Sequence, residues 1–320
     1  MLSFAFNIMI VGFFRRRPDV IIGSSPHLFA ALSAYLLAKL KGSRFFLEIR
    51  DLWPQVLVDM GAATENSFLV MLLRRIETLL YRSAEKIIVL SEGAGRYIAR
   101  RGVEPERISL LPNGVYLEGF EVTENRESIR SRMGVSDKFV VMYAGAHGPA
   151  NALEIIIQAA AIVKNEAEVV FVLVGDGPCK DELRRMVAEE NLDNVKMLPA
   201  VPKSSLPNLL NAADALAITL RSVELFSYGV SPNKLFEYMA IGKPILCAVG
   251  GEVANLVTEA NAGVIVEPED PDALAQAVIY LAENGDKRPV YGANGRKFVE
   301  KNFSRSRIVE NLVSMWIQLF

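Results

Sequence analysis

The sequence predicts an α/β protein with two doubly wound, parallel-sheet domains, and three observations support this fold class. Short apolar runs rich in β-branched residues alternate with helical stretches such as "NALEIIIQAAAIVKN". The runs are apolar along their whole length, as parallel strands are when helices cover both faces of the sheet. The chain has 320 residues, a length that suits about two domains, each with its own core.

The expected strands divide unequally between the two domains. The first domain is expected to hold four strands, at 19–25, 44–50, 85–91 and 107–113. The second is expected to hold six, at 138–146, 169–177, 194–200, 215–220, 244–250 and 263–268. A doubly wound nucleotide-binding domain usually has about six strands. The first domain is therefore expected to be incomplete and to lack its opening strands.

The domain boundary is predicted at Asn113-Gly114, which is a turn signal followed by a polar, charged segment without a strong period. The predicted domains are thus 1–113 and 114–320. The last helix of the second domain is expected to pack back on the first domain.

Composition excludes several classes of function. The net charge of −2 gives no basic field of the kind that nucleic-acid binding needs. The two cysteines have no metal-ligand spacing and suit a reducing, cytoplasmic compartment. With only two histidines, a histidine-rich metal site is excluded, and we expect no metal cofactor.

The N-terminus begins with an apolar run that is followed by arginines at 15–17. A secretory signal would carry its positive charge before the apolar part, and a membrane span needs about 20 residues. A buried helix is the favoured interpretation. The other is a helix on a membrane surface with a basic end, which would give peripheral contact with the inner membrane.

The segment "SPNKLFEYMAIGKP" at 231–244 predicts a helix with an unusual start. Ser231 suits the N-cap and Pro232 the first helical position. Lys234 faces the positive end of the helix dipole, where an acid would be favoured. A bound phosphate would explain it, and Glu237 one turn later could accept hydrogen bonds from a sugar diol. The alternative is a surface pair between Lys234 and Glu237.

Two further strand–turn–helix segments offer close backbone approach to a ligand. "YAGAHGPANAL" places Gly145 and Gly148 in one turn, with His147 between them as a candidate phosphate donor. "VGDGPCKDEL" places Gly175 in another turn. The alternatives are ordinary βα turns with convenient glycines, and a histidine that is merely solvated.

In the first domain, "EIRDLWP" ends a predicted strand with Arg50 and Asp51. Charges at the carboxyl end of a parallel strand are costly unless they are used, so these two are candidate catalytic groups. The alternative is a pair that stabilises the turn. Ser25 and Pro26 suit the cap and first position of the next helix, which would place His27 near the acceptor side of a site.

Several motifs together resemble the GT4 family of retaining glycosyltransferases. They are "SEGAGRYIARRGVEPERISLLPNGV", "VVFVLVGDGP" and "SPNKLFEYMAIGKPIL", in a consistent order from about Pro18 to the end. "RDLWP" resembles bacterial surface-polysaccharide enzymes of the fucosamine-transferase type. The resemblance implies the GT-B fold of two Rossmann-like domains, a UDP-sugar donor on the C-terminal domain and an acceptor on the N-terminal domain.

The resemblance also implies roles for individual residues. The donor pyrophosphate is expected at Ser231, Pro232, Asn233 and Lys234, the ribose at Glu237 and the base near Val201. Where the family has an earlier glutamate, this chain has Gly229. The family's usual Arg and Lys after the strand at 138–146 are absent, so Lys234, the glycine-loop N–H groups and Arg221 are expected to meet the phosphate charge. Arg50 or Asp51 stands nearest the place of the family's N-domain histidine.

The expected function is transfer of a sugar, an N-acetylated deoxyhexose, from a UDP-sugar to a lipid-linked saccharide acceptor with retention, in surface-polysaccharide (O-antigen or capsule) synthesis. Such transfer needs no protein nucleophile, which agrees with the absence of a Ser-His-Asp set. Two alternatives remain. One is a UDP-sugar epimerase of the same fold. The other is a non-catalytic or partner-dependent subunit, suggested by the missing strands.

Overall fold

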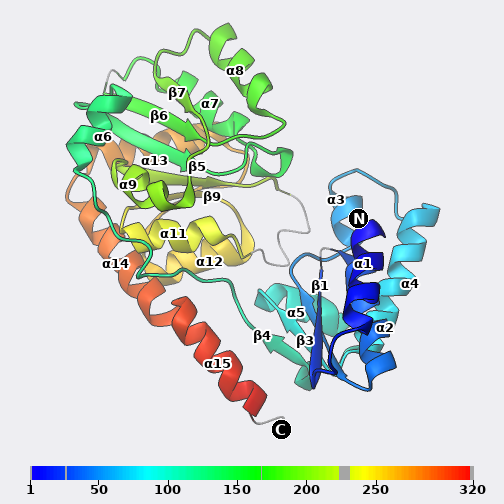
Figure 1. Ribbon diagram of the computed structural model, residues 1–320. Helices are drawn as coiled ribbons and strands as arrows, with labels where there is room; N and C mark the ends of the chain where they lie inside the picture. Colours follow the sequence, from blue (N-terminus) through cyan, green and yellow to red (C-terminus); the bar gives the residue numbers. More distant parts are fainter. Residues whose placement is uncertain (1, 26, 167, 223–230, 318–320) are drawn as a thin grey trace. The chain divides into compact units, whose positions relative to one another are not determined.

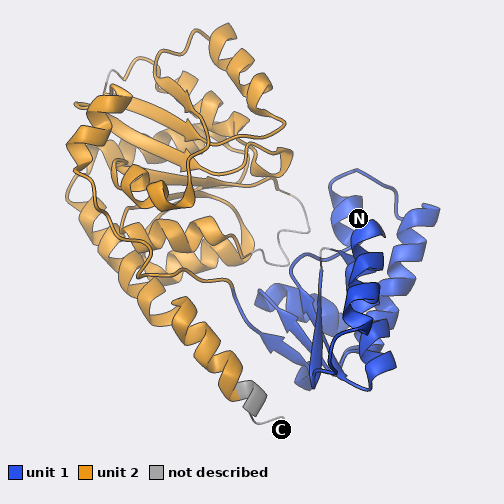
Figure 2. Cartoon of the chain, viewed as in Figure 1, with its two compact units in different colours: residues 1–112, 223–230 blue, residues 113–222, 231–320 orange. Residues whose placement is uncertain are grey.

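The structure is a computed structural model that describes residues 2–25, 27–166, 168–222 and 231–317 (Figure 1). The chain divides into two compact units (Figure 2). Unit 1 comprises Met1–Pro112 with Val223–Val230, and unit 2 comprises Asn113–Ser222 with Ser231–Phe320. Each unit is built on its own sheet, so each is described separately.

Unit 1 is a four-stranded parallel sheet in the order β1-β2-β3-β4. The strands follow one another in the chain and are connected by helices, which is the βαβ arrangement that the alternating pattern predicts. Its elements are α1 (Leu2–Phe13), β1 (Val20–Ser24), α2 (Leu28–Lys41), β2 (Arg44–Ile49), α3 (Gln55–Asp59), α4 (Phe68–Ser83), β3 (Lys86–Val89), α5 (Glu92–Arg100), η1 (Pro105–Arg107) and β4 (Ile108–Leu110).

Unit 2 is a six-stranded parallel sheet in the order β10-β9-β8-β5-β6-β7. Its strands are β5 (Phe139–Ala144), β6 (Val169–Val174), β7 (Val195–Leu198), β8 (Ala215–Thr219), β9 (Ile245–Ala248) and β10 (Gly263–Ile265). The strand order reverses beside β5, since β6 lies on one side of it and β8 on the other. Ligands of such sheets bind at the carboxyl ends of the strands next to this reversal.

Helices and short 3₁₀ turns connect the strands of unit 2. They are α6 (Arg126–Met133), η2 (Pro149–Asn151), α7 (Glu154–Ile162), α8 (Lys180–Glu189), η3 (Lys203–Ser205), α9 (Leu206–Asn211), α11 (Asn233–Ile241), α12 (Gly251–Ala260), α13 (Pro271–Glu283), α14 (Lys287–Asn302) and α15 (Arg305–Ile317). The α/β fold class with two parallel-sheet domains is confirmed, and each of the ten predicted strands is present.

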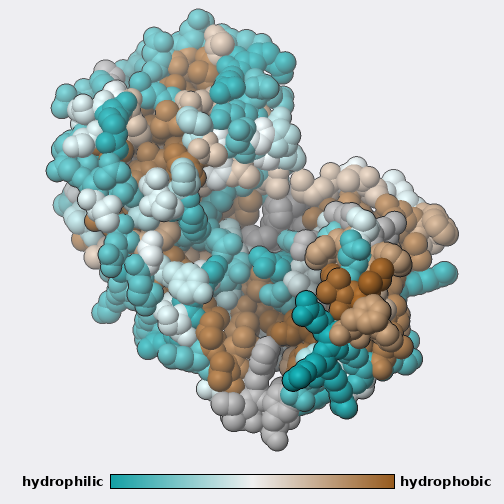
Figure 3. All heavy atoms as spheres, viewed as in Figure 1, coloured by the Kyte–Doolittle hydropathy of each residue, from teal (hydrophilic) through white to brown (hydrophobic). Residues whose placement is uncertain are grey.

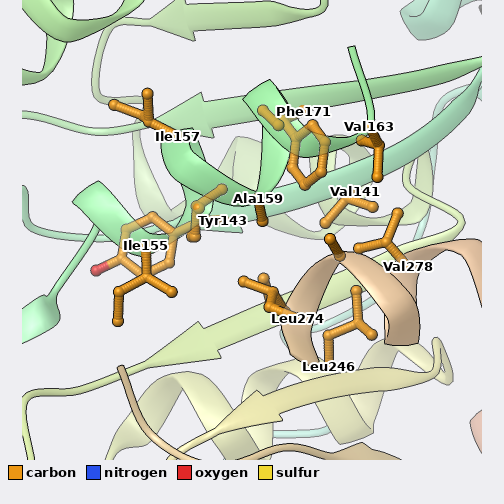
Figure 4. Close-up of a cluster of buried hydrophobic side chains, with 14 of the residues drawn as sticks. Val141, Tyr143, Ile155, Ile157, Ala159, Val163, Phe171, Leu246, Leu274 and Val278 are labelled. Carbon is orange, nitrogen blue, oxygen red and sulfur yellow. The ribbon is translucent and has the colours of Figure 1, made fainter. Parts of the chain in front are cut away.

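The core of unit 2 explains why its strands read as continuous apolar runs. Every residue of β5 and β6 is buried. Figure 4 shows Val141 and Phe171 from these strands in one hydrophobic cluster with Ile155 of α7 and Val278 of α13. Cys247 in β9 is fully buried in the same sheet, and burial raises the pKa of its thiol to about 12.

The first helix is not buried, so the favoured interpretation of the N-terminal run is wrong. In α1 only Ala5 is buried among the described side chains, whereas Phe4, Phe6 and Phe13 are 57%, 67% and 59% exposed. The helix is apolar all round, and α2 covers one side of it. Figure 3 shows hydrophobic side chains gathered on this part of unit 1. In the described part of the chain, no helix is both long and apolar enough to span a bilayer.

Candidate functional site

A pocket of about 450 Å³ opens at the carboxyl ends of the unit 2 strands. Its walls are the loops after β5, β6 and β7 together with the first turns of α11. This is the edge where a doubly wound sheet binds its ligand, and the volume is that of an ordinary small-molecule site. The lining residues are Ala144, Gly145, Ala146, Val174, Gly175, Asp176, Ala200, Val201, Lys203, Leu206, Asn233, Lys234 and Glu237.

The start of α11 differs from the prediction in its cap. The helix begins at Asn233, and Pro232 holds the N-cap position with extended backbone angles. Ser231 does not cap the helix, because its hydroxyl accepts a hydrogen bond from the Asn113 backbone N–H at 3.2 Å. The Asn113 side chain donates in turn to the Ser231 carbonyl at 2.7 Å. The Leu235 N–H donates to the Pro232 carbonyl at 3.0 Å, and with no side-chain cap the N–H groups of Asn233 and Lys234 remain available to an anion.

Lys234 is held in the pocket by two neutral partners. Its ammonium donates to the Tyr143 hydroxyl at 2.7 Å and to the Asn151 side-chain oxygen at 2.9 Å. It also lies 4.2 Å from the centre of the Tyr143 ring. The Tyr143 hydroxyl donates to the Ala146 carbonyl at 2.9 Å, so the strand end and its loop fix the position of the lysine.

The charge of Lys234 is not compensated by any residue that the structure describes. Among the described residues no carboxylate forms an ion pair with its ammonium. Burial lowers its pKa to about 7, an effect that Glu237 partly opposes. A buried cation without a counter-ion is unfavourable unless something supplies the opposite charge. The pocket therefore has the electrostatics expected of an anion-binding site.

Glu237 lies one turn further along α11, and its side chain is almost buried. Its carboxylate pairs with Lys203 of η3. The alternative of a surface pair between Lys234 and Glu237 is therefore wrong, because the two side chains bind different partners. Because Lys203 is largely exposed, a ligand diol that donates hydrogen bonds to the Glu237 carboxylate can displace the lysine.

Two glycine-containing loops form the wall opposite α11, and one close approach requires glycine. A Cβ on Gly175 would lie 1.9 Å from the Gly145 carbonyl oxygen. Gly175 also has φ of +149°, which is unfavourable for other residues. Lys180, buried at the start of α8, donates to the carbonyls of Gly175 at 2.5 Å and Leu198 at 3.3 Å. It holds together the loops after β6 and β7.

His147 is fully buried, so the interpretation of a solvated histidine is wrong. Its backbone binds the next loop on both sides: its N–H donates to the Asp176 carbonyl at 2.8 Å, and its carbonyl accepts from Cys179 at 2.9 Å. Neither ring nitrogen makes a hydrogen bond of normal geometry with a described residue. Burial lowers the pKa of the ring, and the nearby charge of Lys180 adds to this effect.

The other predicted donor residues of unit 2 are placed differently. Val201 lines the pocket, as its predicted role near the base requires. Gly148 precedes η2 and does not line the pocket. Arg221 also does not line it, because its guanidinium is already paired with Glu154 at 2.5 Å and Glu269 at 3.0 Å. The structure therefore gives no support for Arg221 as a phosphate ligand.

Sequence reasoning missed four polar residues that shape the pocket: Tyr143, Asn151, Lys180 and Lys203. Lys203 follows the predicted strand at 194–200, so the rule that ligands bind at strand ends could have found it. Tyr143 is hidden in a strand that is otherwise apolar. Asn151 gains its role through Lys234, which is distant in sequence, and Lys180 through the carbonyls of Gly175 and Leu198 in two loops.

The predicted residues of unit 1 lie at the carboxyl ends of two strands, His27 after β1 and Arg50 and Asp51 after β2. The Ser25 hydroxyl accepts from the Arg50 backbone N–H and donates to the Asp51 carbonyl, both at 3.1 Å. Ser25 thus joins two loops and does not cap α2, whose N-cap residue is His27. Burial raises the pKa of the Asp51 carboxyl, and Arg50 partly opposes this. Pro26 and Gly229 lie outside the described residues.

The comparison with protein families matches both parts of the chain. The family described as glycosyl transferases group 1 matches residues 125–298. The family described as glycosyl transferase 4-like domain matches residues 3–114. Together the two matches contain every residue that we have singled out in the two units.

Two curated proteins are similar over most of the chain. A probable glycosyltransferase, WbjE, of Pseudomonas aeruginosa is 27% identical over 284 residues, which is 88% of this chain and 70% of WbjE. A putative colanic acid biosynthesis glycosyl transferase, WcaI, of Escherichia coli K12 is 26% identical over 309 residues, which is 94% of this chain and 74% of WcaI.

Solved structures share the fold. Anabaena Alr3699/HepE in complex with UDP superimposes with a TM-score of 0.80 at 19% identity, covering 99% of this chain and 82% of that one. Sucrose-phosphate synthase from Thermosynechococcus elongatus has a TM-score of 0.77 at 22% identity, covering 94% of this chain and 74% of that one. The two-unit architecture is thus that of the GT-B fold.

Proposed function

Because the chain belongs to the group 1 glycosyl transferases, we propose that the pocket around Lys234 binds the nucleotide diphosphate of a UDP-sugar donor. The observation that carries this proposal is the partly buried Lys234 ammonium, which has neutral partners and no anionic one among the described residues. It lies in the first turn of α11, where free N–H groups also favour an anion. Complexes of Anabaena HepE with UDP and with UDP-glucose support a donor of this class.

Each part of the donor has a matching group in the pocket. The diphosphate would lie against Lys234 and the N–H groups at the start of α11. The ribose hydroxyls would donate to Glu237 in place of Lys203. The uracil would lie beside the backbone near Val201, where amide groups can read its edge.

The reaction that suits this arrangement is transfer of the sugar with retention, without a protein nucleophile. As the bond to the sugar breaks, negative charge builds up on the leaving diphosphate. Lys234 and the α11 amides would stabilise that charge. Binding of both substrates in a productive orientation would supply a further part of the rate acceleration. Arg50 and Asp51 would be the unit 1 groups that contact the acceptor or the reacting sugar.

The finer parts of the proposal rest on the resemblance of motifs such as "RDLWP". The transferred sugar would be an N-acetylated deoxyhexose, and the acceptor a lipid-linked saccharide of surface-polysaccharide synthesis. WbjE and WcaI, the latter with a name that refers to colanic acid, support this general class of product. The enzyme would act on the cytoplasmic side of the inner membrane, with peripheral contact through unit 1.

The direct test is calorimetry with UDP and with uridine on the unchanged protein and on Lys234→Ala. UDP should lose about tenfold or more in affinity, because a hydrogen bond to a charged group contributes roughly 1.5–3 kcal/mol. Uridine should be nearly unaffected. Lys164→Ala, an exposed lysine of unit 2 outside the pocket, is the control. Equal losses of affinity for uridine and UDP would show that Lys234 acts through the fold and would contradict its proposed contact with the phosphate.

Product analysis separates transfer from the alternatives. A transferase incubated with a UDP-sugar and a saccharide acceptor releases UDP and forms a glycoside, whereas an epimerase forms an epimeric sugar and no glycoside. Binding of UDP without turnover, restored by a second chain, would identify a partner-dependent subunit. Addition of EDTA should leave turnover unchanged if the reaction is independent of metal, as we propose.

A further inference from the structure

Unit 1 has a pocket of about 430 Å³ at the edge of its sheet opposite Arg50 and Asp51. Its walls are the end of α4, the end of α5 and the turn before β4. These segments precede strands, so they lie at the amino ends of the parallel sheet. Four of the lining residues are arginines: Arg82, Arg100, Arg101 and Arg107. This pocket shares no lining residue with the proposed donor site.

Two of the four arginines are used by the fold itself. Arg101 pairs with the buried Glu77 at 2.9 Å. Arg107 pairs with Glu104 at 2.9 Å and donates to the Tyr81 carbonyl at 2.7 Å. These contacts connect η1 and the end of α5 to α4.

Arg82 and Arg100 are exposed, and their side chains make no ion pair or hydrogen bond with a described residue. Each lies in the last turn of its helix, where the dipole favours a cation by roughly 0.3–1 kcal/mol. The dipole explains one basic residue at each helix end. It does not explain why two unpaired guanidinium groups share a pocket with two paired ones, since like charges repel.

We propose that this arginine pocket binds a phosphate group, with Arg82 and Arg100 as its charged donors. The planar guanidinium group donates two parallel hydrogen bonds to phosphate oxygens and is always protonated. The anion would neutralise the two unpaired charges. Two sources can supply the group: a soluble phosphate compound, or the headgroup of an anionic lipid.

The surface of α4 continues the pocket with apolar side chains. Phe68, Leu72 and Leu79 lie at helical spacing with Arg75 and Arg82 and are 78%, 38% and 42% exposed. A shallower hollow of about 350 Å³ includes Leu79 and Arg75 and shares Arg82 with the arginine pocket. A lipid could thus place its phosphate among the arginines and its acyl chains along α4.

The test compares Arg82→Gln/Arg100→Gln with a control of equal charge, Arg96→Gln/Arg184→Gln. The control arginines are exposed, paired with Glu92 and Asp181, and lie outside the pocket. All proteins carry Lys234→Ala, so that phosphate bound in unit 2 does not contribute. Melting temperatures confirm that each variant is folded. Binding is measured to inorganic phosphate and to phosphatidylcholine vesicles with and without phosphatidylglycerol.

We expect the pocket variant to lose about tenfold or more in affinity and the control to lose far less. Loss with inorganic phosphate identifies a soluble ligand, whereas loss only with the phosphatidylglycerol vesicles identifies a lipid headgroup. Arg82→Lys/Arg100→Lys should recover part of the binding, because it keeps the charge but not the paired donors. Equal loss in the control, or no binding of either probe before substitution, overturns the proposal.

Discussion

The carboxyl edges of the two sheets differ in how their polar groups are satisfied. In unit 1 the Ser25 hydroxyl accepts from the N–H of Arg50 and donates to the carbonyl of Asp51, so the loops bond to one another. In unit 2 the corresponding edge holds Lys234 without a counter-ion among the described residues, and the start of α11 has no side-chain cap. The loops of the unit 1 edge thus bond to one another, whereas the unit 2 edge holds a cation without a counter-ion among the described residues.

The two sheets also differ in burial. All residues of β5 and β6 in unit 2 are buried, whereas β1 of unit 1 is mostly part-exposed, with Ile22 42% exposed. Substitutions that disturb the packing of the unit 2 loops should therefore weaken ligand binding directly. Comparable substitutions on the surface of unit 1 should have small effects.

The largest difference is expected between two glycines with positive φ. Gly175→Ala in unit 2 drives a Cβ into the Gly145 carbonyl, whereas Gly61→Ala in unit 1 meets no atom within 4 Å. We expect the first to weaken UDP binding about 100-fold by displacing the loop. The second should cost about 1 kcal/mol of stability and leave UDP binding unchanged. Calorimetry and thermal unfolding measure both, and normal UDP affinity in Gly175→Ala would contradict the proposed role of this loop.

Removal of the Glu237 carboxylate should have the next largest effect. Glu237→Ala is expected to weaken UDP binding by roughly 1–3 kcal/mol, because the ribose loses its charged acceptor. Lys203→Ala is the matched variant, since it removes the partner and keeps the carboxylate.

We expect Lys203→Ala to change UDP affinity by less than about fivefold, as for an exposed ion pair. Both variants are measured by calorimetry with UDP. If a folded Glu237→Ala protein binds UDP as tightly as the unchanged protein does, Glu237 does not hold the ribose.

The pH dependence tests the charge of Lys234. Its pKa is about 7 in the free protein, against an ordinary value of 10.5. Above about pH 7 the Lys234 amine is mostly neutral and must take up a proton when UDP binds. The affinity for UDP should therefore fall by up to about tenfold per pH unit. The unfolded chain keeps this proton up to about pH 10.5. The lysine should therefore add to the free energy of unfolding as pH rises from 7 towards 10.5. Lys234→Met should remove both dependences, and an unchanged pH profile in that variant would refute the assignment.

The smallest effect is expected on the exposed face of α1. Phe6 is 67% exposed, so Phe6→Ser should change the free energy of unfolding by less than about 0.5 kcal/mol. The same change should reduce self-association, which we measure by light scattering as a function of concentration, because apolar surface is removed. Strong destabilisation by this substitution would mean that α1 packs more closely than its exposure indicates.

The strands could be predicted from sequence because their signal is local. A buried parallel strand such as β6 has to be apolar along its length, and all ten strands were found in this way. The predicted ends extended further, as at 107–113 against Ile108–Leu110, because turn residues next to a strand share its composition.

Contacts distant in sequence decided the features that could not be predicted. Ser231 does not cap α11 because its hydroxyl accepts a hydrogen bond from Asn113, and Glu237 pairs with Lys203. His147 looked solvated, but the loop after β6 packs against it. For α1 the pattern showed an apolar helix and could not show which side its neighbours cover. The α11 start was found because a lysine in a first turn is a local anomaly.

The buried thiol of Cys247 offers a way to follow one unit alone. Both cysteines of the chain lie in unit 2, and unit 1 contains none. With its pKa raised to about 12, Cys247 carries almost no thiolate at neutral pH and is shielded from reagents while β9 stays paired. Cys179 is partly exposed and reacts first. The slow second phase of thiol labelling would thus report how often the six-stranded sheet opens. A nucleotide that stabilises unit 2 would slow this second phase.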